Sequence, residues 1–126
     1  MKTNPFTFTN VMGAVMSSSI ATLARVLEQK IIDVPEDETK LIKDSMASLR
    51  EKMMALDLNL KNNSYTIDIN QNEMSMIGLA LIMVLKAIQN HNAEDFFGRD
   101  IMAANEISIQ FEKMDWTEDK ETSNED

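Results

Sequence analysis

The residue types that most often perform chemistry are scarce in this chain of 126 residues, which has no cysteine, one histidine and three glycines. Without cysteine there can be no disulfide bonds, thiolate metal sites, iron–sulfur clusters or cysteine nucleophiles. A carboxylate-bridged di-metal centre in a helical bundle needs a Glu-x-x-His pair on each of two helices. Here His91 precedes Glu94, which is the reverse order, so we interpret His91 as a solvated residue of a predicted turn.

Acidic residues alone could bind magnesium, as in all-α nucleotide pyrophosphohydrolases, which place Glu-x-x-Glu and Glu-x-x-Asp pairs on facing helices. Asp33 and Glu36 instead have the spacing of a helix cap, and no Glu-x-x-Asp pair follows inside an apolar helix. The acids at Glu94, Asp95 and Asp100 are spaced so that they do not converge on one ion. A metal-dependent nucleotide hydrolase is therefore an alternative and not our preferred interpretation.

Serine and basic residues also form no recognisable site. Ser17, Ser18 and Ser19 have no His or Lys nearby in the sequence, and the isolated glycines form no phosphate-binding loop. A net charge of -9 argues against a broad phosphate-binding surface. We therefore predict a non-enzymatic protein without catalytic residues, cofactor or bound metal, and without direct binding to nucleic acid.

A few residues suggest binding instead. Two adjacent aromatic residues, Phe96 and Phe97, cannot both face one side of a helix, so we expect one of them to meet a partner. Arg99 could anchor an acidic group, although an ion pair within the chain is the simpler interpretation. Together with His91 and Tyr65, these residues are the candidate contacts for a partner or a small-molecule ligand.

Apolar residues recur at spacings of three and four, which predicts a mostly α protein of about four helices in a small bundle. The first helix is expected over 11–31, with Asn10 as its N-cap. The capping-box spacing of Asp33 and Glu36, with Pro35 between them, predicts the start of the second. Because the link between them is short, these two helices should form an antiparallel αα-hairpin.

A short strand and a second helical hairpin complete the predicted fold. Tyr65–Ile69 alternates apolar and polar residues as a strand does, and the capping-box pair Asn70 and Glu73 opens a third helix over 71–89. Phenylalanine and threonine also alternate within residues 1–9, but Pro5 and the terminal position weaken the prediction of a strand there.

The C-terminal part should contain the fourth helix and a tail. Asn92 and Asp95 are expected to start this helix. Residues 107–111 alternate as a strand could, but we favour helix because no glycine or proline separates them from the preceding alanines. We predict one helical domain over 1–114, and a disordered acidic tail over 115–126.

Two of the helices suggest self-association. The second has nearly three heptads of an a/d seam, which could close the hairpin or pair with a second chain. The third has almost no polar side between Met74 and Leu85, so either this chain or another subunit must cover it. Methionines suit irregular partner surfaces, although filling gaps in the core is their commoner use. We predict a homo-oligomer, with interface candidates Met46, Leu49, Met53, Leu56, Met76, Leu79 and Met83.

The strand Tyr65–Ile69, the cap Asn70-x-x-Glu73 and the helix Met74–Ile88 resemble a pattern common among small accessory proteins of Gram-positive phages and mobile elements. This resemblance implies an accessory or regulatory protein, in the strongest form an inhibitor, that binds host or phage proteins. The net charge favours a partner with a basic surface and predicts salt-sensitive binding. A small-molecule-binding or sequestering oligomer is the alternative.

We expect a cytoplasmic protein that does not enter a membrane. The first ten residues do not have the apolar core of a secretory signal. The most hydrophobic run, Met76–Leu85, is also too short, because about 20 apolar residues are needed to cross a bilayer.

Overall fold

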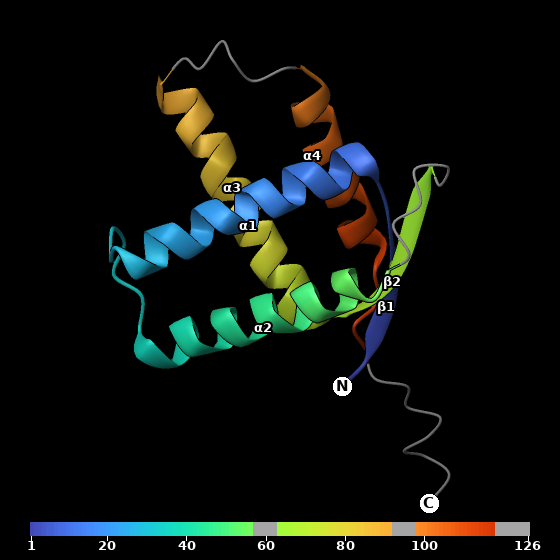
Figure 1. The fold of residues 1–126 in the computed structure, drawn as a ribbon, viewed down its shortest axis with the longest axis horizontal. Coiled ribbons are helices and arrows are strands. Elements are labelled where there is room, and N and C mark those ends of the chain that lie inside the picture. Colours follow the sequence, from blue (N-terminus) through green and yellow to red (C-terminus); the bar gives the residue numbers. More distant parts are fainter. Residues whose placement is uncertain (57–62, 92–97, 118–126) are drawn as a thin grey trace, which may run out of the picture.

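The computed structural model of the chain describes residues 1–56, 63–91 and 98–117, and within them it contains four helices and a two-stranded sheet (Figure 1). This confirms the predicted mostly α fold of about four helices. The elements are β1 Thr3–Thr9, α1 Asn10–Glu28, α2 Glu36–Met54, β2 Ser64–Asn70, α3 Gln71–His91 and α4 Gly98–Lys113.

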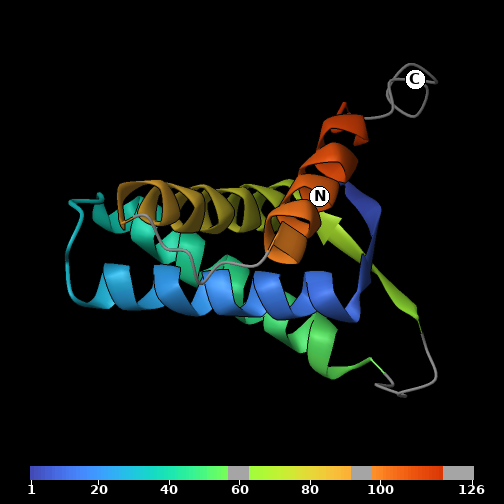
Figure 2. The same ribbon diagram turned by 90° about the horizontal axis from the view of Figure 1, so that it is seen from above.

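Helices α1 and α3 lie at the centre of the fold. Helices α1 and α2 run in opposite directions, as the hairpin prediction requires, and α3 crosses and packs against both of them (Figures 1 and 2). Helix α4 packs against α1, and the sheet lies at the end of the molecule where α1 begins (Figure 1). Helices α1 and α3 therefore each pack against the other three helices and against one strand.

The core lies between the helices and one face of the sheet. Buried and exposed residues alternate along both strands, so one face of the sheet is apolar and the other is exposed to solvent. The ring of Phe6 lies 5.6 Å from that of Phe8 and 5.4 Å from that of Phe111, between ring centroids. Such aromatic pairs add about 1 kcal/mol each beyond the area that they bury. Phe111 thus fixes α4 against the strands.

The first strand is more regular than its sequence indicates. β1 pairs with β2 along its whole length in an antiparallel register, with Thr3 opposite Asn70 and Thr9 opposite Ser64. Proline lacks an N–H, but Pro5 lies at a position whose backbone faces away from β2, so no ladder bond is lost. Residues 107–111 are helical, as favoured above.

The N-cap and the last residue of α1 differ from the prediction. Its N-cap is Thr9 and not Asn10, because the Thr9 hydroxyl accepts a hydrogen bond from the Met12 N–H at 3.2 Å. The helix ends at Glu28 and not at Ile31. Lys30 has a φ of 51°, in the left-handed region, and the Ile31 N–H donates to the Val26 carbonyl at 3.1 Å, which closes the helix in a Schellman motif.

The predicted capping box of α2 is wrong. The helix begins at Glu36 with Pro35 at the N-cap, and no side chain caps it. Asp33 lies two residues before the cap, which is too early for its carboxylate to serve the first turn. The acidic residues of that turn, Glu36, Asp37 and Glu38, complement the helix dipole.

The later helix bounds also differ from the prediction. Helix α3 extends two residues beyond the predicted end at 89, so His91 is the last residue of a helix and not part of a turn. Helix α4 begins at Gly98. The predicted cap, Asn92 with Asp95, lies outside the described residues.

The start of the predicted tail contacts the domain. The Asn4 side-chain amide donates to the Asp115 carbonyl at 2.9 Å, and the Lys2 ammonium donates to the Thr117 carbonyl at 2.7 Å. Trp116 is half-buried against the core. Residues 115–117 therefore lie along β1, and the rest of the predicted tail is outside the described residues.

Candidate interaction surfaces

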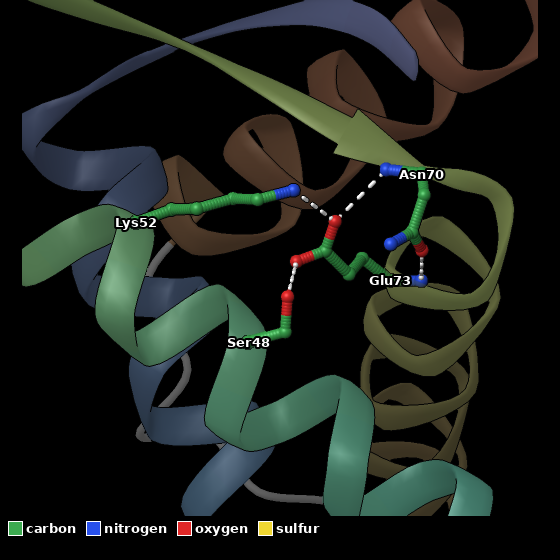
Figure 3. A network of polar contacts seen from close by, with 4 residues as sticks. All are labelled: Ser48, Lys52, Asn70 and Glu73. Carbon is green, nitrogen blue, oxygen red and sulfur yellow. Dashed lines mark hydrogen bonds and ion pairs between the residues drawn. The ribbon is translucent and has the colours of Figure 1, made fainter. Parts of the chain in front are cut away.

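A buried carboxylate fixes the junction between β2 and α3 (Figure 3). Glu73 is fully buried, and its Oε1 accepts a hydrogen bond from the Asn70 N–H at 2.8 Å while the Glu73 N–H donates to the Asn70 side chain at 2.8 Å. This reciprocal pair is the capping box that the sequence predicts. It fixes the direction in which the chain leaves β2.

Helix α2 supplies the other partners of this carboxylate. Lys52 forms an ion pair with Glu73 Oε1, and the Ser48 hydroxyl donates to Glu73 Oε2 at 2.9 Å (Figure 3). A buried charge whose oxygens are all hydrogen-bonded is tolerated, whereas removing one partner leaves an uncompensated group. The cap residue therefore also ties α2 to the start of α3, which the sequence analysis did not predict.

The outer edge of β1 is occupied. The Gln110 side chain on α4 accepts a hydrogen bond from the Thr7 N–H at 3.0 Å, and its amide donates back to the Thr7 carbonyl. One side-chain amide thereby takes the place of a neighbouring strand. Pro5 has no N–H to offer on the same edge, and the Thr9 N–H points to the Met12 sulfur. We call this edge, from Thr3 to Thr9, the guarded edge.

The outer edge of β2 differs. Thr7 is opposite Thr66, and paired residues of an antiparallel ladder turn their backbone groups the same way, so the Thr66 N–H and C=O also point away from the partner strand. The same holds for Ser64 and Asp68, two residues to either side. Within the part of the chain that the structure describes, nothing pairs with the outward groups of Thr66 and Asp68. We call Ser64–Asp68 the open edge.

A second unpartnered surface lies on α3. Met76, Ile77, Ala80 and Leu81 are buried in the core, but Leu79 is 36% exposed and Ile82 is 52% exposed. The chain therefore buries one side of the helix fully and leaves these two apolar side chains partly exposed. Cover by another subunit stays a prediction.

Of the predicted contact residues, the structure describes only the side chain of Tyr65. Tyr65 is buried on the inner face of the sheet, with its ring 5.8 Å from that of Phe8, so it is part of the core. His91 ends α3 and Arg99 lies in the first turn of α4, and only their backbones are described. Phe96 and Phe97 lie outside the described residues.

The interface candidates divide into three groups by their exposure. Leu49 and Met76 are buried within the chain, so in this fold they cannot contact another subunit, which corrects their assignment. Leu79 is exposed, as an interface residue must be. The remaining candidates are half-buried and pack against the core from α2, its end or α3: Met46, Met53, Leu56 and Met83. Filling gaps in the core is thus the main use of these methionines.

A shallow groove of about 320 Å³ runs beside the guarded edge. Its walls come from β1, the first turn of α1 and α4, and Glu106 is its single titratable residue: Thr7, Phe8, Thr9, Met12, Glu106, Ile109 and Gln110. One carboxylate without a partner base or acid does not form a catalytic pair. The described residues contain no group of three His, Asp or Glu that could hold a metal ion.

Comparison of the chain with protein-family models, curated proteins and solved structures finds no match. Helix α1 is long and apolar enough by length and composition to cross a membrane. It also lies near the N-terminus, and it packs Met16 and Leu23 fully into the core, as a core helix of a soluble protein does. The structure is therefore compatible with a soluble protein.

Proposed function

We propose that this protein is a non-enzymatic, acidic protein-interaction module of the cytoplasm that associates with itself and binds a partner protein. In this role it acts as an accessory or regulatory protein, of the kind that phages and mobile elements use to modify host or phage proteins. We also propose that binding inhibits the partner protein.

The observation that supports the proposal best is the exposed apolar face of α3. Leu79 and Ile82 are large apolar side chains that remain partly exposed on α3, one of the two helices that pack against all the others. Isolated exposed apolar residues are ordinary, but two that lie three residues apart share one face of a helix. Covering both of them is worth about 2 kcal/mol or more to a complex.

The charge of the chain indicates the kind of partner. A net charge of -9 attracts basic surfaces over a distance of about 10 Å in moderate salt. Charge of this kind mainly speeds association and selects the partner, whereas the apolar contact slows dissociation. We therefore propose a partner with an apolar site surrounded by lysine or arginine.

Capture from the native host with paired variants tests this proposal. The variant Leu79→Ser/Ile82→Ser removes the apolar face, and Leu41→Ser removes a comparably exposed leucine on α2 as the control. We expect a protein that the wild type and the control capture and the α3 variant does not, with direct binding when purified and weaker binding at high salt. Equal capture by all three forms would contradict the role of α3, and salt-independent capture would contradict the electrostatic part.

A further inference from the structure

The two edges of the sheet differ in a way that points to a partner for one of them. Exposed strand edges pair readily with other strands, and proteins usually block them. The guarded edge is blocked by Gln110 and Pro5, but the open edge has no such device among the described residues. In both ribbon views the beginning of β2 lies at the outer margin of the molecule (Figures 1 and 2).

We propose that the open edge of β2 pairs with the open edge of a second copy of this chain, which joins two sheets into one four-stranded antiparallel sheet. This inference rests on the self-association in the proposed function and names the surface that performs it. The face of α3 then remains available for the partner protein.

The length of the open edge selects the register. The Asn70 N–H is already bonded to Glu73, so the strand can offer free outward groups only from Ser64 to Asp68. The centre of that segment is Thr66. Two antiparallel copies that use the whole segment therefore place Thr66 opposite Thr66 of the second copy, across a two-fold axis.

The side chains suit this register. It places Ser64 opposite Asp68 of the other copy, so each carboxylate can accept a hydrogen bond from a serine hydroxyl and the two aspartates do not face each other. On the inner face, Tyr65 comes opposite Ile67 of the other copy, but both side chains are buried in their own core and the register does not depend on a contact between them.

The absence of cysteine makes a sharp test possible, because one introduced cysteine is unique. In the proposed register, Thr66→Cys places two thiols at directly opposed residues about 5.5 Å apart between Cα atoms, which a disulfide can span. The control Thr7→Cys lies on the same exposed face and loses the same hydroxyl contact, since Thr7 and Thr66 bond to each other at 2.9 Å. Its copies would be three strand spacings apart, or about 14 Å, which is too far.

Mild oxidation of both variants at micromolar concentration gives the result. We expect Thr66→Cys to form a disulfide-linked dimer roughly 1,000-fold faster than Thr7→Cys, because a paired site raises the effective thiol concentration from micromolar to millimolar. Equal rates for the two variants would overturn the edge pairing. If native mass spectrometry then still shows a wild-type dimer, self-association stands and only its surface is wrong. A wild-type monomer at the same concentration overturns both.

Discussion

The sheet has two strands of equal length, and their outer edges differ in what they bind. Along β1, a glutamine from a helix more than 100 residues away in sequence binds both backbone groups of Thr7, and a proline removes one N–H. Along β2, the outward groups of Thr66 and Asp68 have no partner in the described residues. A side chain of α4 thus occupies the edge of β1, while the edge of β2 stays available for pairing. A strand edge without a hydrogen-bonding partner can therefore indicate an interaction surface as much as an unusual side chain can.

The largest effect should come from Glu73, which ends the open edge by holding the Asn70 N–H. In Glu73→Ala the capping box is lost and Lys52 and Ser48 lose their buried partner, so we expect a loss of about 3–5 kcal/mol in the free energy of unfolding. Urea denaturation measures this change in the free energy of unfolding. Glu73→Gln keeps an acceptor for the cap and should lose clearly less, and equal stability of Glu73→Ala and the wild type would contradict the structural role of this network.

Removing the Gln110 side chain should leave the outer edge of β1 unpaired, like that of β2. Gln110→Ala frees the Thr7 N–H and C=O, and we expect a loss of about 1–2 kcal/mol in the free energy of unfolding for its two hydrogen bonds. It should also produce assemblies larger than those of the wild type, because both edges can then pair. Sedimentation velocity and urea denaturation measure the two effects. The control Glu112→Ala, on an exposed residue of the same helix, should change neither.

A charge on the open edge should weaken self-association. Because Thr66 faces its own copy in the proposed register, Thr66→Lys places two like charges directly opposite each other. We expect the dissociation constant of the dimer to rise roughly fivefold, which corresponds to about 1 kcal/mol. As the control, Thr7→Lys adds the same charge to the same face of the sheet, but on β1. A larger effect of Thr7→Lys than of Thr66→Lys would reverse the assignment of the two edges.

The smallest effect should come from Asp115, in the segment that lies along β1. Hydrogen bonds from Thr117, together with the Lys2 ammonium, hold the pKa of the Asp115 carboxyl below its ordinary value of 3.8. The folded state therefore gains stability from this group above that pH, and the gain is lost as the pH falls through the lowered pKa. Thermal unfolding between pH 2 and pH 6 should show a slightly weaker pH dependence for Asp115→Asn than for Glu112→Gln. Identical profiles would show that this contact contributes nothing.

Local signals predicted one part of this molecule well. The alternation in β2, the cap formed by Asn70 and Glu73, and the apolar α3 lie next to each other in sequence, and each depends on near neighbours. Where neighbouring signals competed, the prediction was wrong, as with Thr9 against Asn10 and with Asp33 before α2. In both cases the position where the helix begins, set by the packed fold, decides which side chain can reach the first turn.

The rest depended on contacts between distant residues. Nothing near Gln110 in the sequence indicates that its amide will lie against Thr7, and nothing near Lys52 indicates a buried carboxylate on another helix. Pro5 argued against a strand that the fold forms, because only the register shows that its missing N–H faces outward. The candidate surfaces could be predicted only in part for the same reason. Leu79 was among the interface candidates, whereas the open edge becomes visible only once β1 has paired with β2.

Native mass spectrometry of wild type, Thr66→Lys and Thr7→Lys at one micromolar-range concentration is the most direct test of the account. We predict that the wild type and Thr7→Lys give mainly a species of twice the 14.3 kDa chain mass, and that Thr66→Lys shifts toward the single chain. A wild type that stays monomeric, or a dimer that Thr66→Lys leaves unchanged, would contradict pairing through the open edge.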